Sequence, residues 1–121
     1  MYILKVRNHF DAAHFLRGYQ GPCANTHGHS FKYEVDILGN ELDSIGMLAD
    51  FTEVKKKLKE IVESKLDHAL LNDVEPFDKI NPTAENLSKV IYTLLKYRTD
   101  FNIISVAVWE SDDCGVVYTE E

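Results

Sequence analysis

The sequence predicts an α+β domain in which four antiparallel strands carry two helices on one face, in the order ββααββ. Two long segments alternate apolar and polar residues, two later segments repeat apolar residues at helical spacing, and two short alternating segments follow them. The length of 121 residues favours a single domain, residues 1–121. The long first pair of strands leaves sheet edges that need cover, so we expect copies of the chain to pair through them.

The first alternating segment predicts a strand from Tyr2 to about His14. Its apolar side chains lie on one side, with His14 among them, and its charged side chains lie mainly on the other. A loop rich in Gly and Pro over residues 17–22 then returns the chain toward a partner strand. Residues 29–37 alternate most regularly, and Gly39 ends this second strand.

Asp50, followed three residues later by Glu53, resembles a capping box and predicts a helix that begins at Phe51. Its apolar stripe comprises Phe51, Val54, Leu58, Ile61, Val62 and Leu66. Residues 66–81 then show no sustained periodicity. A structureless connection of this length in a compact domain is more often functional than idle.

A second helical pattern opens at Pro82 and Thr83 and ends near Tyr97. The sequence leaves open whether Asn81 or Thr83 caps it. Its apolar stripe comprises Leu87, Val90, Ile91, Leu94 and Leu95. Two strands follow over residues 102–110 and 115–119, joined by a short hairpin connection.

Charge and composition narrow the class of protein. The net charge of -7 argues against a general nucleic-acid or anionic-membrane surface. The apolar stretches are far shorter than the roughly 20 residues that span a bilayer, and the start lacks a secretory pattern, so we expect a cytoplasmic protein. Cys23 and Cys114 allow at most one disulfide, and we expect both to be free thiols.

Three histidines form the candidate metal site. His27 and His29 flank Gly28 at the entrance to the second strand, where residues two apart point to the same face. His14 approaches them if the first two strands pair. Three neutral imidazoles with an open fourth position are the ligand set of a catalytic zinc. The alternative is a group of ordinary hydrogen-bonded histidines beside a loop.

Cys23 lies four residues before His27, close to this site. Nearby positive charge favours the thiolate that a base or nucleophile requires. Two alternatives stay open for this thiol. It is a fourth ligand that closes a structural zinc site without catalysis, or it is a small apolar side chain in a turn.

Carboxylates and a fourth histidine complete the candidates. Asp67 and His68 pair a carboxylate with an imidazole, although neighbours in a loop can point apart. Glu110 shares the strand face of Ile104, Val106 and Val108, where an unpaired carboxylate is costly. A ligand with paired N–H donors would satisfy Glu110. The alternative is a strand end that reaches water.

Together these residues resemble the 6-pyruvoyltetrahydropterin synthase and 6-carboxytetrahydropterin synthase family. The resemblance rests on FDAAH at 10–14, CANTHGH at 23–29, LDHALLN at 66–72, NPTAEN at 81–86 and VWE at 108–110. These motifs occur in the family's order and cover essentially the whole chain. The element Cys-x-x-x-His-Gly-His with a later Leu-Asp-His is the specific part of the match.

The resemblance implies a tunnelling fold, or T-fold, in which three four-stranded sheets close a barrel and two such rings stack into a homo-hexamer. It implies zinc held by His14, His27 and His29, with 7,8-dihydroneopterin triphosphate as the substrate. A small-molecule substrate fits the expectation of no nucleic-acid and no membrane partner.

The resemblance also implies roles for the remaining candidates. Glu110 would anchor the pterin ring, and Cys23 would abstract a proton from the substrate side chain. Asp67 and His68 would form an acid–base relay supplied by a neighbouring protomer. Glu85 matches a position near the pterin pocket, and Thr83 beside it is a further candidate for substrate contact. The alternative for Glu85 is an interaction with the helix dipole alone.

Two reactions are known in the family. One releases acetaldehyde and triphosphate and leaves 6-carboxy-5,6,7,8-tetrahydropterin, in the bacterial queuosine (7-deazapurine) route. The other eliminates triphosphate and yields 6-pyruvoyltetrahydropterin. We favour the first, because three residues separate Cys23 from His27 and the chain is compact. A non-catalytic, metal-stabilised pterin-binding oligomer is a third hypothesis.

The chain departs from the family pattern at Phe15, where the family often has Arg after the first histidine. Arg17 and Lys32 are therefore candidates for contact with the triphosphate.

Overall fold

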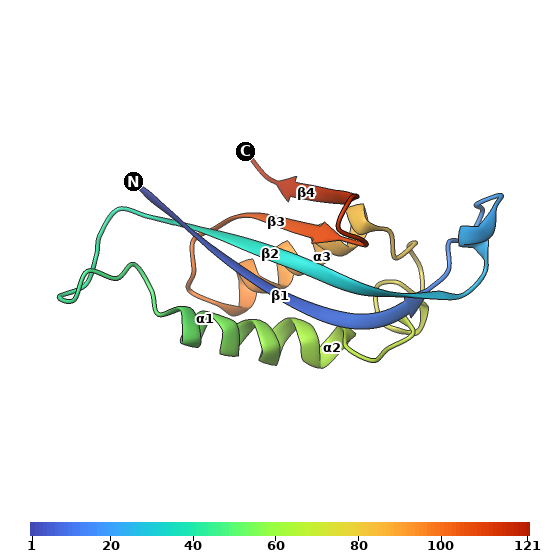
Figure 1. The fold of residues 1–121 in the computed structure, drawn as a ribbon, viewed down its shortest axis with the longest axis horizontal. Coiled ribbons are helices and arrows are strands. Elements are labelled where there is room, and N and C mark those ends of the chain that lie inside the picture. The colour runs from blue at the N-terminus through green and yellow to red at the C-terminus, as the bar shows by residue number, and fades with distance from the viewer.

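The computed structural model describes all 121 residues and has the predicted order of elements. Strands β1 (Tyr2–His14) and β2 (His27–Gly39) form a long antiparallel hairpin, and β3 (Ile103–Trp109) and β4 (Gly115–Thr119) complete the sheet order β1-β2-β3-β4. Figure 1 shows the helices together on one side of this sheet. The predicted α+β class is confirmed.

The register of β1 against β2 explains which side chains face the helices. Val6 lies opposite Val35, and Phe10 lies opposite Phe31, and all four side chains are buried. Successive side chains of a strand point to opposite faces. The even-numbered residues of β1 and the odd-numbered residues of β2 therefore build the covered face, as the alternation predicts.

The first helix begins as predicted, because the Asp50 carboxylate accepts a hydrogen bond from the backbone N–H of Thr52 at 2.9 Å. It is not regular, however. Helix α1 (Phe51–Leu58) passes through a π-helical turn, η2 (Lys59–Glu63), into α2 (Ser64–Leu66). The predicted burial of Phe51 is wrong. Phe51 is 57% exposed, because it lies at the helix start in a surface hollow between the first residues of β1 and the loop before the helix.

The connection between α2 and α3 is not uniformly irregular. It contains a 3-10 turn, η3 (Leu71–Asp73), and a bridge that pairs Leu70 with Ala13 of β1. Helix α3 (Ala84–Arg98) starts after Thr83, whose hydroxyl accepts a hydrogen bond from the Asn86 amide at 3.1 Å. Thr83, and not Asn81, is therefore the cap.

The buried face of helix α3 differs slightly from the predicted apolar stripe. Leu87, Ile91 and Leu95 are fully buried as predicted, whereas Val90 and Leu94 are half-buried. Ala84, Ser88 and Tyr92 occupy the remaining buried positions. The helix therefore turns one flank of its predicted apolar stripe partly toward solvent.

Strand β3 is shorter than predicted and contains an irregularity. Asp36 pairs with Ser105 but Ile37 pairs with Ile103, so the register skips Ile104. Ile103 is consequently buried in the core, and Ile104 is only half-buried. The predicted face of Ile104, Val106 and Val108 is thus correct for the two valines and wrong for Ile104, because an extra residue in one strand shifts the alternation.

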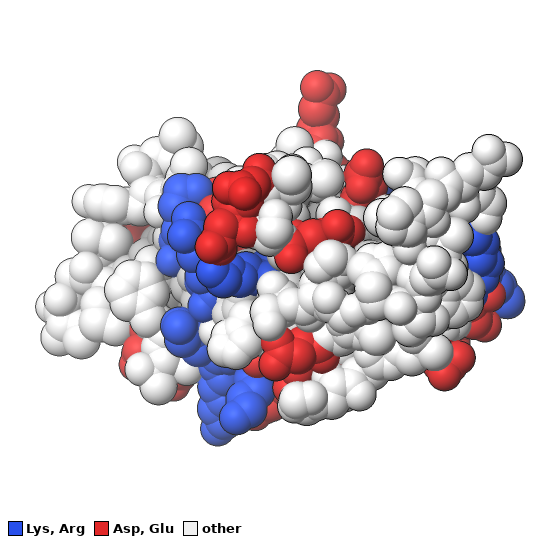
Figure 2. All heavy atoms as spheres, turned by 45° about the vertical axis from the view of Figure 1, so that its right-hand side comes forward, with Lys and Arg blue, Asp and Glu red and all other residues white.

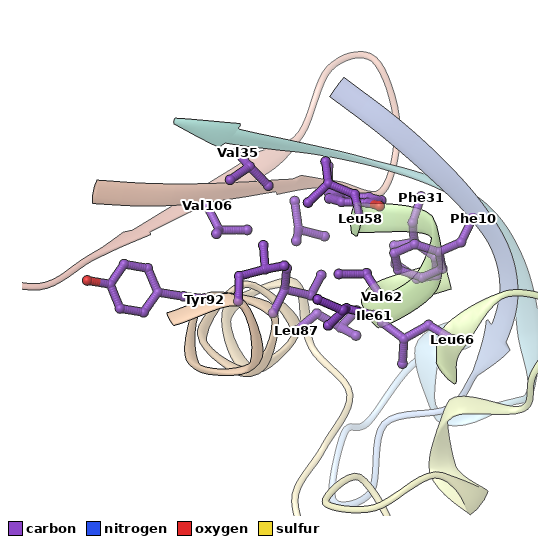
Figure 3. Close-up of a cluster of buried hydrophobic side chains, with 14 of the residues drawn as sticks. Phe10, Phe31, Val35, Leu58, Ile61, Val62, Leu66, Leu87, Tyr92 and Val106 are labelled. Carbon is purple, nitrogen blue, oxygen red and sulfur yellow. The ribbon is translucent and has the colours of Figure 1, made fainter. Parts of the chain in front are cut away.

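One hydrophobic core lies between the sheet and the helices. Figure 3 shows Phe10, Phe31 and Val35 of the sheet pointing toward side chains of the helices. This cluster contains 22 buried residues. The longest helix, α3, has 15 residues, and none of the helices has the length and apolarity needed to cross a bilayer.

The other face of the sheet is polar. Lys5 contacts Asp36 at 2.7 Å, and Arg7 contacts Glu34 at 2.8 Å. On the surface seen in Figure 2, basic side chains are bordered by acidic ones. We call the sheet face that carries Lys5, Arg7, Glu34 and Asp36 the open face, in contrast to the covered face that packs against the helices.

Candidate metal centre

The three histidines converge at one end of the β1–β2 hairpin. His14 lies directly opposite His27, and His29 follows two residues later on the same face of β2. The ring centroids are 4.6 Å apart for His14 and His27, 5.1 Å for His14 and His29, and 4.9 Å for His27 and His29. One nitrogen of each ring lies within 4.8 Å of the other two, so the three side chains can hold one metal ion.

Backbone carbonyls orient two of these rings. His14 Nδ1 lies 2.8 Å from the carbonyl oxygen of Pro82, and His27 Nδ1 lies 2.7 Å from that of Asn25. A bond from the Nδ1 hydrogen to a carbonyl leaves Nε2 with a free lone pair, which is a common arrangement around metals. The second nitrogen of each ring is thus available to a ligand.

The buried nitrogens lack partners within the chain. His14 is 1% exposed, and neither its Nε2 atom nor that of His29 has a hydrogen-bond partner. Burial lowers the pKa of His14 and outweighs the hydrogen bond to the Pro82 carbonyl and the charge of Glu110, which act in the opposite direction. Because a metal ligand must be the neutral imidazole, this environment suits cation binding. The residues present therefore fit a metal ion.

Cys23 lies in the short turn η1 (Pro22–Ala24) before β2. Its carbonyl accepts a hydrogen bond from the Leu16 amide at 2.9 Å, and its thiol is free and half-buried. Cys114 is also free, so the expectation of two free thiols is confirmed. The group of mutually close ligand atoms consists of three imidazoles and does not include the Cys23 sulfur.

Glu110 lies one residue beyond β3, where its amide donates to the Cys114 carbonyl at 3.2 Å and closes the turn to β4. Its carboxylate lies 3.9 Å from His29 Nε2, and its side chain is 34% exposed. Of the two alternatives that the sequence leaves open for Glu110, the structure shows the strand end that reaches water. Glu110 emerges at the strand end, beside the histidines, where it can meet both water and a ligand.

Asp67 and His68 lie against the edge of β1 that faces away from β2. The Asp67 carboxylate accepts a hydrogen bond from the Asp11 amide at 2.9 Å, and the His68 amide donates to the Asp11 carbonyl at 2.6 Å. His68 has a φ of 59°, unusual for a residue with a side chain. This conformation brings its ring to 3.5 Å from the Asp67 carboxylate, so these neighbours point together.

The His68 ring is 80% exposed. A surface hollow of about 570 Å³ is lined by Asp11, Gly28, His29, Ser30 and His68, among others. It lies open to solvent at the sheet edge.

Thr83 and Glu85 lie at the start of α3. The Thr83 hydroxyl serves as the helix cap, and Glu85 is exposed in the first turn, where a carboxylate suits the helix dipole. Their predicted contacts with a pterin stay predictions.

Two asparagines, for which the sequence predicts no role, hold the segment that follows β1. The Asn72 side chain accepts from the Phe15 amide and donates to the Phe15 carbonyl, each at 3.0 Å. Asn81 makes the same pair of bonds with Arg17, each at 2.9 Å. The signal was present in the motifs at 66–72 and 81–86, because an amide can mimic a neighbouring strand.

The two candidates for triphosphate contact are engaged elsewhere. The Arg17 guanidinium donates to the Phe77 carbonyl at 3.0 Å and lies over the Phe15 ring. Lys32 pairs with Asp112 at 2.8 Å on the open face. In this conformation both side chains have partners within the chain, and their contact with a triphosphate stays a prediction.

Comparison with known proteins agrees with this geometry. Residues 3–121 match the family model described as 6-pyruvoyl tetrahydropterin synthase. The chain is 30% identical to a 6-carboxy-5,6,7,8-tetrahydropterin synthase of Haemophilus influenzae, over 92% of this chain and 94% of that one. It is 41% identical to a 6-pyruvoyl tetrahydrobiopterin synthase of Dictyostelium discoideum, over 84% of this chain and 76% of that one.

Comparison of the fold with solved structures gives the same result. The structure of Caenorhabditis elegans 6-pyruvoyl tetrahydropterin synthase superposes with a TM-score of 0.86 at 25% identity, covering 99% of this chain and 96% of that one. The match of nearly the whole chain, in sequence and in fold, establishes that it belongs to the 6-pyruvoyl tetrahydropterin synthase family of lyases.

Proposed function

We propose that this protein is a zinc-dependent 6-carboxy-5,6,7,8-tetrahydropterin synthase. It would convert 7,8-dihydroneopterin triphosphate, with uptake of water, to the 6-carboxy product, acetaldehyde and triphosphate, as a step toward 7-deazapurines such as queuosine. The observation that carries the proposal is the group of three imidazoles with two buried, unpartnered Nε2 atoms. The Haemophilus relative, matched over nearly its whole length, supports the carboxy product.

His14, His27 and His29 would hold the zinc, since nitrogen ligands in a set of three suit this ion. Zinc bound there would supply Lewis-acid polarisation of the hydroxyl groups on the substrate side chain. The Pro82 and Asn25 carbonyls keep two of the imidazoles in the orientation and tautomer that ligation needs.

The surrounding side chains would carry the proton transfers and the binding. Cys23, in its turn beside β2, would take a proton from the substrate side chain. The partly exposed Glu110 carboxylate would accept two N–H groups of the pterin ring, and it lies on the histidine side of the sheet end. Thr83 and Glu85 would line the pocket from the start of α3.

Asp67 and His68 would serve the site of a neighbouring protomer. Their support is the 80% exposure of the His68 ring, together with the position of both residues on the outer edge of β1. Such a pair, oriented but open to solvent, is suited to completing a pocket formed by another chain.

The sheet edges support assembly through strands. The odd-numbered residues of β1 direct their backbone groups away from β2, and residues 67–70 cover only its far end, at Asp11 and Ala13. Residues 3–9 thus keep a free edge, and β4 is the other edge strand. We propose that three sheets join through these edges into a barrel and that two rings form a hexamer.

A second product has a specific observation in its favour. The Dictyostelium relative is more similar over the segment that it matches, and it is named for the pyruvoyl product. Elimination of triphosphate from the same substrate would use the same histidines and the same thiol.

Mass analysis of the pterin formed from 7,8-dihydroneopterin triphosphate tests the proposal. We expect 6-carboxytetrahydropterin with stoichiometric acetaldehyde. A pyruvoyl product would mean that the protein catalyses the second reaction, the elimination of triphosphate. Bound but unchanged substrate after prolonged incubation with the zinc-loaded protein would contradict catalysis and favour the pterin-binding oligomer.

A further inference from the structure

A carboxylate lies at the junction of the first helix and the sheet, beside the hydrophobic core, where an apolar side chain would be expected. Glu63 is the last residue of the π-helical turn, and its Oε2 atom accepts hydrogen bonds from two side chains. Asn8 Nδ2 donates at 2.8 Å and the Tyr33 hydroxyl donates at 3.1 Å. Tyr33 is fully buried, and Asn8 and Glu63 are half-buried.

The π-helical turn is what directs Glu63 to the sheet. Each residue of a regular helix advances the chain by about 100°, so an inserted residue rotates everything that follows. Ile61 and Val62 fill the core within this turn, and Glu63 then meets the polar pair from β1 and β2. Burial, followed by the negative charge of Glu63, raises the pKa of Tyr33 and keeps its hydroxyl a donor.

Four residues later, the same helix end makes a second attachment to β1. The Asp67 amide donates to the Glu63 carbonyl at 2.8 Å, which is the last helical hydrogen bond. The Asp67 carboxylate and the His68 amide then bind the backbone of Asp11. Glu63 and Asp67 thus fasten one helix end to one strand at two points, Asn8 and Asp11.

We propose that Glu63 is a positioning residue, which fixes the rotation of the helix end and thereby the direction of Asp67 and His68. The inference rests on the proposed function for its catalytic consequence. His68 has a left-handed φ of 59°. On its C-terminal side the segment is held by the bond from the Ala13 amide to the Ala69 carbonyl at 3.0 Å, so the direction of His68 depends on how the helix end delivers it to its bond with Asp11. Loss of the attachment at Asn8 and Tyr33 lets the helix end turn and releases the bond at Asp11.

Three variants test this proposal. Glu63→Ala removes both hydrogen bonds, and Glu63→Gln keeps an acceptor oxygen for Asn8 and Tyr33. Glu60→Gln is the matched control, because Glu60 is an exposed glutamate of the same π-helical turn. Should Glu63→Ala fail to fold, Tyr33→Phe removes one donor at almost constant volume.

Hydrogen exchange at the His68 amide is the first readout, since it reports the bond to Asp11 without reference to activity. We expect exchange to accelerate about tenfold or more in Glu63→Ala, and less in Tyr33→Phe. The reason is that the segment around His68 can then open locally without breaking the hydrogen bonds of Glu63 to Asn8 and Tyr33. Glu63→Gln and Glu60→Gln should exchange like the unmodified protein. The zinc content of all variants should be unchanged, because the histidines lie on other elements.

Steady-state kinetics provide the second readout. In Glu63→Ala, kcat should fall about tenfold or more while KM for the pterin stays within about twofold, because a displaced acid–base pair costs rate and not binding. Normal exchange at His68 in Glu63→Ala would overturn the proposal, as would a loss in Glu63→Gln equal to that in Glu63→Ala. If the unmodified protein has no turnover, the proposed function fails, and the exchange data still decide whether Glu63 positions His68.

Discussion

The two faces of one sheet differ in how their polar groups are satisfied. On the open face, Lys5, Arg7, Glu34 and Asp36 pair with one another, and the Arg7 side chain is 76% exposed. On the covered face, polar side chains are few, and two histidine nitrogens have no partner within the chain. The same two strands build both faces by alternation, so the contrast arises from what covers each face. Asp36 Oδ1 on the open face is also buried without a partner, so the site is marked by the gathering of such atoms on neighbouring imidazoles, and not by the abundance of charge.

The largest effect is expected from removing a covered-face histidine. In His29→Ala, the metal content should fall well below one ion per chain, and turnover should drop by at least about a hundredfold, since even the outer supports of metal ligands contribute tenfold to a hundredfold. Metal analysis together with product formation measures both.

His9→Ala is the matched control, because His9 is an exposed residue of β1 on the open face. It should keep both metal and activity. Full metal content in His29→Ala would contradict the assignment of the site to the covered face.

Removing the thiol should be the next largest change, and it separates catalysis from structure. Cys23→Ala should lower turnover at least about a hundredfold, because a positioned base contributes that much, while zinc stays bound. Cys114→Ala, at the exposed thiol, should change neither. If zinc is lost and the protein unfolds in Cys23→Ala, the closed structural site is the better description.

The covered face extends beyond the sheet through Asn72, which is only 4% exposed and pairs with both backbone groups of Phe15. Asn72→Ala leaves the partly buried N–H and C=O of Phe15 without these partners, so we expect a loss of about 2 kcal/mol in the free energy of unfolding. Denaturant unfolding measures it. Asn102→Ala, at an exposed position, should leave the unfolding midpoint in place; equal losses in the two variants would contradict a special role for Asn72.

Substitutions on the open face should change the stability of the protein least, and the size of the change should depend on pH. Burial alone would raise the pKa of Glu34, but the hydrogen bond and charge of Arg7, with Lys5, outweigh it and lower the pKa below 4.5. A carboxylate with a lowered pKa stabilises the fold above its ordinary pKa, and this contribution is lost as the pH falls through the lowered value.

Arg7→Gln should therefore be slightly less stable than the unmodified protein at neutral pH, and the difference should shrink as the pH falls below about 4.5. Thermal unfolding across this pH range at low and high salt measures the effect. A difference that grows toward acid would contradict this reading of the pair.

Alternation and spacing predicted much of this arrangement. The long hairpin, and with it the meeting of His14, His27 and His29, follows from two alternating segments of matched length. The π-helical turn was not predictable in the same way, because both Ile61 and Val62 are apolar and either phase of the helix buries one of them. The shifted pairing at Ile104 was not predicted for a similar reason. Its neighbour Ile103 is also an isoleucine, and it takes the buried position expected for Ile104.

Long side chains and loop contacts were the least predictable features. Arg17 and Lys32 reach carbonyl and carboxylate partners that lie far away in the sequence, and only the folded chain brings these within reach. The same holds for Pro82, whose carbonyl orients His14 from 68 residues away. Glu110 was placed on the correct strand, but its exposure depended on where β3 ends.

Zinc titration of the metal-free protein, followed by X-ray absorption spectroscopy of the zinc-bound form, tests whether His14, His27 and His29 alone ligate the metal. We expect one zinc ion per chain, with three histidine nitrogens at about 2.0–2.1 Å and no sulfur neighbour. A sulfur ligand at about 2.3 Å, or binding of much less than one ion per chain, would contradict it.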